Sequence, residues 1–191
     1  MIKRDTLLSL EEYARQRPQW RQKVMEHKKR RTVHLGEHVT LQFEDELTVR
    51  YQVQEMLRIE RIFEEAGIEG ELQAYNPLVP DGGNWKATMM IEYPDEPERR
   101  AMLAQLKGIE RKAWVQVADG ERVYAIADED LERENEDKTS SVHFLRFELA
   151  RPMREALRAG AGLTVGLDHP RYTASAQVAP EVRASLVADL K

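Results

Sequence analysis

Polar side chains that could hold an anion recur at helical spacing within residues 47–66. They are Arg50, Gln54, Arg58 and Arg61. Residues three or four apart lie on the same side of a helix, so these heads would form one stripe. Guanidinium groups arranged in this way are suited to a carboxylate or a phosphate. The alternative is a solvated face with pairs inside the helix, which is the commoner outcome for rows of charge on amphipathic helices.

The same segment places Glu60 among apolar side chains. The apolar members of that face are Val49, Val53, Met56, Leu57, Ile59 and Phe63. Burying an unpaired carboxylate costs several kcal/mol. Glu60 must therefore lie at the end of the packed region, pair with a cation, or stay protonated.

His34 and His38 form the first candidate pair for metal binding. They surround Gly36-Glu37, which predicts a two-residue hairpin turn. Neighbouring side chains of a strand alternate between faces, so the two imidazoles would point in opposite directions and not share a metal. A longer turn would change the register and reopen the metal interpretation.

The remaining candidates for proton transfer are His143 and His169. His143 alternates with Leu145 and Phe147, which predicts a hydrogen-bonded core histidine. His169 follows Asp168 where a strand runs into a turn, and loops at such junctions often carry functional groups. The structural alternative is that Asp168 caps the turn and the following proline fixes it.

Composition excludes several classes of chemistry. The chain of 191 residues has no cysteine, so it has no disulfide framework, thiolate metal site or cysteine nucleophile. No catalytic motif is complete, and neither a cofactor nor a metal is predicted. No apolar run approaches the length of a membrane span, and we expect a cytoplasmic protein.

Positive charge gathers in residues 1–31, which we predict to be a basic helical N-terminal arm. The run Lys28-Lys29-Arg30-Arg31 follows Trp20, a pattern that could contact phosphates and stack a base. The whole chain nevertheless carries a net charge of −5, which disfavours a dedicated nucleic-acid binder. Such a run also complements the dipole at the end of a helix.

The elements that must position these residues alternate between helices and hairpins. Helices are predicted at 7–31, 47–66, 69–75, 96–108, 151–159 and 181–190, and strands at 33–35, 39–43, 85–93, 113–118, 121–127, 141–149, 163–167 and 172–178. Ser9 and Asp45 are expected N-caps, Pro18 is expected to divide the first helix, and Gly67 is expected to lie just past the second. We predict a single α+β domain over 1–191, with a mainly antiparallel sheet of hairpins and helices packed on it.

Several segments together resemble a family of uncharacterised bacterial proteins of about this length. They are Thr48 to Met56, Arg58, Glu60-Arg61, Tyr75-Asn76, Ser140 to Val142 and Gly166 to Pro170. The resemblance covers nearly the whole chain and implies no reaction. It draws attention to a set of ligand-binding candidates: Arg50, Tyr51, Gln54, Glu55, Arg58, Glu60, Asn76, Asp168 and His169.

The resemblance also implies a gene neighbourhood. That neighbourhood contains rubrerythrin and a cysteine-rich iron–sulfur oxidoreductase similar to heterodisulfide reductase or to the iron–sulfur subunit of anaerobic glycerol-3-phosphate dehydrogenase. Our first hypothesis is therefore a non-catalytic accessory protein that binds a partner of this redox system.

Other hypotheses stay open at this point. One is a small-anion or small-ligand site, or the active site of an enzyme, in which Arg50, Arg58 and Asn76 hold an acidic group while Glu60 or His169 handles a proton. Another joins His169 to Glu55 or Glu60 in an iron or manganese site. Neither the substrate nor the oligomeric state follows from the sequence.

Overall fold

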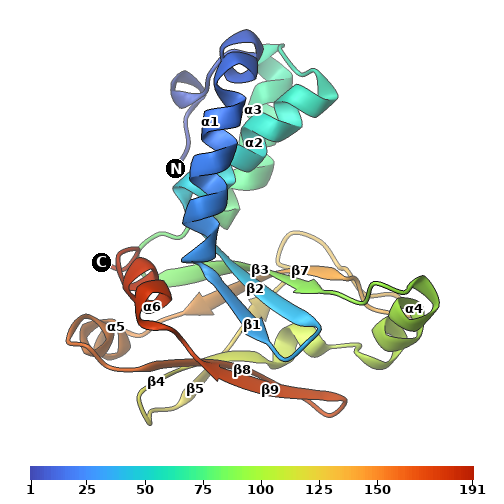
Figure 1. The fold of residues 1–191 in the computed structure, drawn as a ribbon, viewed down its shortest axis with the longest axis vertical. Helices are drawn as coiled ribbons and strands as arrows, with labels where there is room; N and C mark the ends of the chain where they lie inside the picture. Colours follow the sequence, from blue (N-terminus) through green and yellow to red (C-terminus); the bar gives the residue numbers. More distant parts are fainter.

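The computed structural model describes residues 1–191, in which a stalk of helices stands on two facing antiparallel sheets (Figure 1). The stalk comprises α1 (Leu10–Lys29), α2 (Glu46–Glu60) and α3 (Glu65–Tyr75). Because α2 leaves the sheets directly after a strand, its carboxyl end lies at the tip of the stalk, far from the sheets. The predicted α+β class with mainly antiparallel pairing is confirmed.

All strand pairs are antiparallel. The strands are β1 (Thr32–Leu35), β2 (Val39–Glu44), β3 (Asn84–Ile91), β4 (Ala113–Val117), β5 (Arg122–Tyr124), β6 (Ile126–Ala127), β7 (Val142–Glu148), β8 (Leu163–His169) and β9 (Tyr172–Gln177). Sheet A has the order β1-β2-β3-β7-β6, and sheet B has the order β5-β4-β8-β9. The stalk stands on sheet A.

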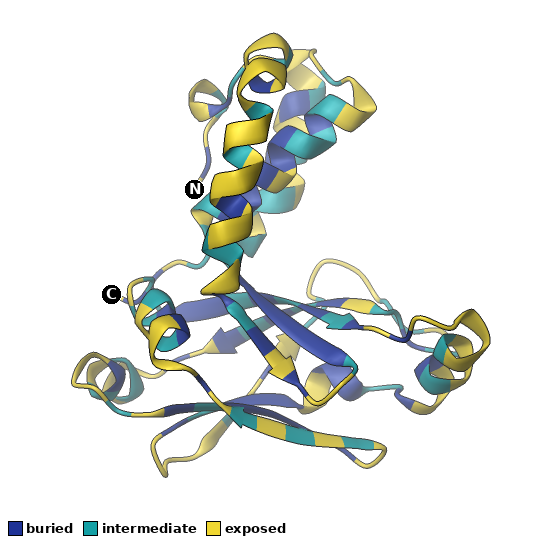
Figure 2. Ribbon diagram, viewed as in Figure 1, coloured by how far each residue is buried: buried dark blue, intermediate teal, exposed yellow.

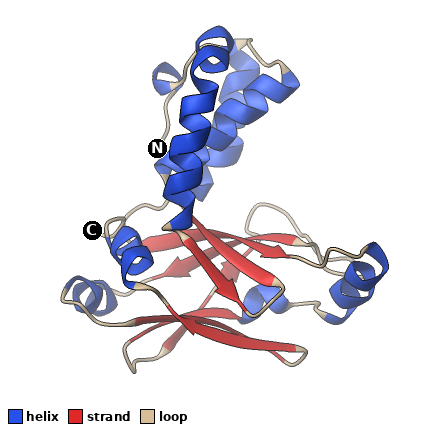
Figure 3. Cartoon of the chain, in the orientation of Figure 1, coloured by secondary structure: helices blue, strands red, loops and turns tan.

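Shorter helices lie around the rim of the two sheets (Figure 3). They are α4 (Glu96–Gln105), α5 (Arg151–Arg158) and α6 (Pro180–Val187). Of the 3-10 helices, η1 (Arg4–Thr6) and η2 (Asn76–Leu78) lie against α3, and η3 (Ile109–Lys112) leads into β4. The last of the α-helices, α6, lies close to the base of the stalk and brings the C-terminus with it.

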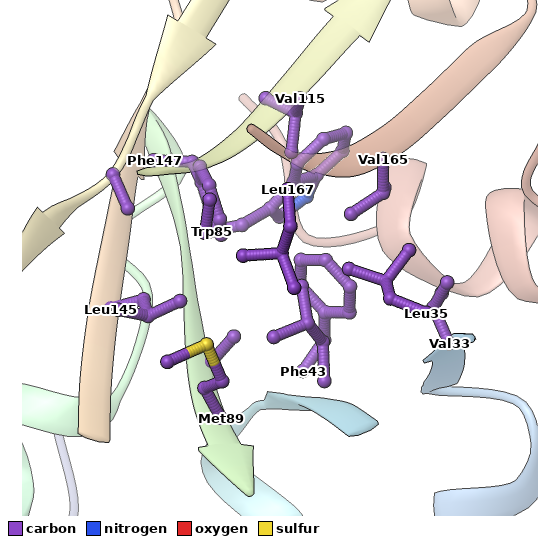
Figure 4. Packing of buried hydrophobic residues seen from close by; sticks show 14 of the residues in the cluster. Val33, Leu35, Phe43, Trp85, Met89, Val115, Leu145, Phe147, Val165 and Leu167 are labelled. Carbon is purple, nitrogen blue, oxygen red and sulfur yellow. The ribbon is translucent and has the colours of Figure 1, made fainter. Parts of the chain in front are cut away.

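The main core lies between the two sheets. Alternation along the strands turns one set of side chains inward, so the facing surfaces are buried (Figure 2). The outer surfaces are more exposed, except at residues such as Thr40 and Gln42 of β2 and Trp114 of β4, which are also buried. Phe43, Trp85 and Phe147 from sheet A meet Val165 and Leu167 from sheet B (Figure 4). The indole N–H of Trp85 donates to the carbonyl of Leu186 at 2.9 Å, so this large ring is buried without an unpaired donor.

The first helix begins as predicted but is not divided at Pro18. Ser9 and Glu12 form a capping box at the start of α1. The helix then continues through Pro18 to Lys29. Proline has no amide hydrogen, so the carbonyl of Ala14 has no donor within the helix. Both residues are exposed, and water can replace the missing hydrogen bond.

The second helix ends earlier than predicted. Asp45 is its N-cap, as expected, but α2 stops at Glu60 because Arg61 adopts a left-handed conformation with φ of 55°. The amide of Ile62 then donates back to the carbonyl of Leu57 at 2.9 Å, which closes the helix end. Gly67 consequently lies inside α3 rather than past the end of α2.

Two predicted hairpin details are wrong. Leu35 pairs with Val39, so the first hairpin loop spans residues 36–38 rather than two residues. The hydroxyl of Tyr172 in β9 fixes this loop by donating to the carbonyl of Leu35 at 2.6 Å. The predicted strand over 121–127 is two strands, because the chain crosses from sheet B to sheet A at Ala125.

Arg31 joins the stalk to the sheets and to the C-terminal helix. Its side chain is 1% exposed. The Nε group donates to the carbonyl of Phe43 at 3.0 Å, and the terminal nitrogens donate to the carbonyls of Glu44 at 3.1 Å and Ser185 at 3.3 Å. Its guanidinium also forms an ion pair with the carboxylate of Asp189. Of the predicted basic run, Arg31 is thus an interior residue and not part of a solvated face.

We expect Arg31→Met to lower the free energy of unfolding by about 3 to 5 kcal/mol, because the change leaves the Asp189 carboxylate buried without its cation. Urea unfolding followed by circular dichroism measures the difference. Arg30→Met is the matched control, since Arg30 is exposed, and it should change stability by no more than about 0.5 kcal/mol. Equal stability of the two variants would contradict this role of Arg31.

Candidate functional site

Glu55 is the polar centre of the stalk. Its carboxylate accepts hydrogen bonds from the hydroxyl of Tyr13 at 2.8 Å, from Arg17 at 2.6 and 2.9 Å, and from Arg58 at 3.3 Å. The bond from Arg17 contributes most to lowering the pKa of Glu55 to about 2, against the opposing effect of burial. Glu55 therefore links α1 to α2 and has no free oxygen turned toward a ligand.

The neighbouring candidates on α2 also make internal contacts. Gln54 is fully buried, accepts from the amide of Leu8 at 2.7 Å and donates to the carbonyl of Leu8 at 3.3 Å. Tyr51 packs against Tyr13 in a small cluster between α1 and α2. Arg50 forms an ion pair with Glu46 one turn earlier on the same helix. These residues fix the path of the chain rather than line a cavity.

Two further candidates lie at the ends of the stalk. Glu60 is exposed at the last position of α2, so it lies at the end of the packed region, which was the first of the three options for this carboxylate. Asn76 lies at the base of α3, where its side chain accepts from the amide of Ile2 at 2.8 Å and donates to the carbonyl of Ile2 at 3.0 Å. Asn76 therefore anchors the N-terminal residues.

Asp168 belongs to a cluster on the outer face of sheet B. Its carboxylate accepts from the hydroxyl of Tyr124 at 2.7 Å and from Arg122 at 2.6 Å. The bond from Tyr124 contributes most to holding the pKa of Asp168 below its ordinary range. Arg122 also lies 4.0 Å from the centre of the Trp114 ring, which crosses Gly166 so closely that a Cβ there would lie 2.2 Å from a ring carbon.

His169 is the last residue of β8, at the expected junction between a strand and a turn. Its Nδ1 accepts from the amide of Arg171 at 3.2 Å, so the proton resides on Nε2, which donates to the carbonyl of Lys107 at 3.1 Å. The side chain is 7% exposed. Both ring nitrogens are satisfied by backbone, and the ring locks the β8–β9 turn against the segment after α4.

The structure does not bring the candidate residues into one cleft. Arg50, Tyr51, Gln54, Glu55 and Arg58 lie along the stalk, Glu60 lies at its tip, Asn76 at its base, and Asp168 and His169 on sheet B. His169 consequently shares no site with Glu55 or Glu60. No group of three or more His, Asp or Glu side chains is arranged to hold a metal ion, and the longer hairpin loop does not make one from His34 and His38.

His143 is a core histidine, as predicted, with partners that resemble a catalytic triad. Its Nδ1 lies 2.6 Å from the carboxylate of Asp128, and its Nε2 lies 3.0 Å from the hydroxyl of Thr139. His143 and Thr139 are, however, 0% and 1% exposed, so a substrate cannot reach the hydroxyl. The arrangement anchors the charged loop over residues 128–138 to β7.

A cleft that the sequence did not predict lies between the stalk and the outer face of sheet A. It consists of two adjoining hollows of about 260 and 510 Å³, which share Tyr75, Leu78 and Phe144. Its floor comes from outward-facing residues of β2, β3 and β7, and its roof from α2, α3 and η2. In β3, Lys86, Thr88 and Met90 alternate with buried residues and therefore face outward. Nothing in the sequence predicted the roof.

A second hollow, of about 350 Å³, lies beside the charged loop. Its lining includes Glu110, which is 2% exposed and has one carboxylate oxygen without a partner. Glu129 and Asp130 also line it, but they pair with Arg146 and Arg133. The hollow is acidic, and its fixed carboxylates are largely committed to arginines.

Comparisons with known proteins place the chain in a family without an assigned function. A family profile described as "Protein of unknown function (DUF3501)" matches residues 1–190, so the chain belongs to this family. A crystal structure described as a novel protein of unknown function from Burkholderia pseudomallei K96243 is 56% identical, with a TM-score of 0.95. That match covers 100% of this chain and 99% of the other. No curated protein matches.

These findings confirm the resemblance to an uncharacterised family, while the implied gene neighbourhood stays a prediction. None of the helices has both the length and the apolar character required to cross a membrane.

We expect the stability of Glu55→Gln to depend less on pH in the acid range than the stability of the wild type. The pKa of Glu55 lies below its ordinary value of 4.5 when folded, so its ionised form stabilises the protein above that pH, and this contribution is lost as the pH falls toward about 2. Urea midpoints measured between pH 5 and 2 should therefore fall less steeply in Glu55→Gln than in the wild type. Glu60→Gln, which removes an exposed carboxylate from the same helix, should leave the wild-type slope. Identical slopes for Glu55→Gln and the wild type would show that the Arg17 bond does not act in solution.

Proposed function

We propose that this protein is a non-catalytic accessory protein that binds a redox partner through the tip of its stalk. The observation that carries the proposal is the exposure of two large apolar side chains at that tip. Ile59 is 55% exposed and Phe63 is 72% exposed. Both lie where α2 turns toward α3, at the end of the molecule farthest from the sheets. Large apolar side chains that remain exposed on a rigid element are typical of protein interfaces.

The rigidity of the stalk supports this proposal. Arg17 and Arg58 bind the Glu55 carboxylate, and Gln54 joins α2 to the segment before α1. The tip is therefore already ordered, and binding a partner costs little conformational entropy. The side chains that were candidates for chemistry thus work as internal supports. A protein that presents a fixed apolar tip and uses its polar residues for its own scaffold is suited to binding a partner.

The partner we propose is rubrerythrin or the iron–sulfur oxidoreductase that the family resemblance implies. The chain has no cysteine of its own, so in such a system thiols and cysteine-held clusters would belong to the partner. This assignment rests on the implied gene neighbourhood together with the exposed tip.

The alternative function is binding of a small anion or small ligand. The Arg50, Arg58 and Asn76 side chains do not share a cavity, so this function would need other residues. The cleft over sheet A offers such residues.

We expect direct binding of purified rubrerythrin or of the purified oxidoreductase, measured by isothermal titration calorimetry. Replacing Ile59 and Phe63 together by Ser should weaken that binding at least about tenfold, because central apolar contacts dominate interface energies. Leu131→Ser is the control, since Leu131 is 56% exposed but lies on the charged loop. Absence of binding by both proteins, or an equal loss with Leu131→Ser, would overturn the proposal.

We also propose that residues 1–191 form one cooperative domain, with the stalk coupled to the sheets through Arg31. Trp20 lies on α1, whereas the other tryptophans, Trp85 and Trp114, lie on the sheets. In Trp20→Phe, tryptophan fluorescence therefore reports the sheets, while circular dichroism at 222 nm is dominated by helices. Coincident urea transitions by the two probes are expected. Two separated transitions would show that the stalk unfolds independently.

A further inference from the structure

The cleft between the stalk and sheet A has an ordered polar floor. Strand register places Glu44, Lys86 and Arg146 side by side in one row across β2, β3 and β7. The next row contains Thr88 beside Phe144. Side chains fixed by register on a sheet cannot easily move away, so their charges define what the cleft can accept.

The roof and walls of the cleft are mainly apolar. Val49 from α2, Tyr75 from α3 and Leu78 from η2 face the floor across the smaller hollow. Phe144 lines both hollows, so the two hollows adjoin. The volumes suit a small organic molecule. The larger hollow also has a charged lining, formed by Glu71, Lys86, Glu129, Asp130, Arg133 and Arg146.

Lys86 is the one cation in its row without a paired carboxylate. Glu44, its neighbour on β2, accepts instead from the hydroxyls of Thr88 and Thr48. Glu129 and Glu148, which lie near its other side, both pair with Arg146. Asp81 contributes a further negative charge near Lys86 and accepts from the amide of Gly83.

The surroundings of Lys86 disfavour its charged form. Burial lowers the pKa of the Lys86 ammonium, and the neighbouring charge of Arg146 lowers it further. An anion placed beside the amine would offset both effects. Lys28 lines the far end of the smaller hollow and is likewise not paired with a carboxylate. Glu71, on α3, is the carboxylate at the larger hollow that has no cation partner.

We propose that this cleft binds a small organic anion with an apolar body. Its acidic head lies against Lys86, and its apolar part lies between Phe144 on the floor and Tyr75 and Leu78 in the roof. Glu71 at the rim weakens the binding by repulsion. This site is separate from the stalk tip, so it holds or fails independently of the proposed partner binding.

The test uses a fluorescent pair of probes that differ in charge. Anilinonaphthalene sulfonate is an apolar organic anion, and phenylnaphthylamine is a neutral molecule of similar shape. Fluorescence titration at neutral pH is expected to give saturable binding of the anion to the wild-type chain, and weaker binding of the neutral probe. Equal affinity for the two probes, or no saturable binding of the anion, overturns the proposal.

Three variants test the placement of the anion. Lys86→Met should weaken binding of the anionic probe about tenfold, which is the loss expected for one charge-assisted hydrogen bond, and should leave the neutral probe unchanged. Glu71→Gln should strengthen binding of the anion. Lys23→Met, which removes an exposed lysine on α1, is the matched control and should change neither probe. An equal effect of Lys86→Met and Lys23→Met overturns the assignment to Lys86.

Leu78→Trp tests the same site by steric exclusion, even if a charge variant loses stability. Leu78 lines both hollows, so the larger side chain takes up space in each of them. Both probes should therefore lose binding, while the circular dichroism spectrum and urea midpoint confirm the fold. Undiminished binding of the anionic probe to a folded Leu78→Trp protein shows that the anion lies elsewhere and overturns the proposal.

Discussion

The burial of the Arg31 guanidinium is the constraint on which the arrangement of the molecule depends. A buried cation is tolerated only when its donors are satisfied and its charge is matched. Carbonyls at the end of β2 and on α6 accept its hydrogens, and the carboxylate of Asp189 supplies the matching charge. These partners come from opposite ends of the chain, so the stalk, sheet A and the C-terminus must meet at one point for Arg31 to be buried at all.

The pKa values of the two carboxylates around Arg31 are shifted in opposite directions. Burial raises the pKa of Asp189, although the hydrogen bond from Arg31 opposes the rise. Burial also disfavours the ionised form of Asp45, but there Arg31, the Thr48 amide and His27 prevail and hold the pKa below its ordinary value. Asp45 is also the N-cap of α2. The charge network at the base of the stalk therefore also fixes where α2 begins. The position of α2 in turn sets how far the roof of the cleft lies from sheet A.

Local chemistry explains which features could be predicted from the sequence. Ser9 and Asp45 cap helices through bonds within a few residues, and alternation along β3 depends only on its own residues. The end of α2 could not be predicted, because Arg61 is a common helix former that here adopts a left-handed conformation. The three-residue loop of the first hairpin depends on Tyr172, which is distant in sequence. Likewise, the role of Glu55 in joining α1 to α2 could not be predicted, because it depends on Arg17 on another helix.

The segments that define the family resemblance are explained by architecture. Gln54 and Glu55 hold the stalk together, Asn76 anchors the N-terminus, and Gly166 leaves room for the Trp114 ring. Residues of this kind are hard to replace because each satisfies a buried polar group or a close approach of backbone to an aromatic ring. A search for function directed at these segments would therefore find scaffold. The stalk tip and the cleft over sheet A are surfaces whose side chains are not used by the scaffold. Differences among related chains at these surfaces would alter what the protein binds.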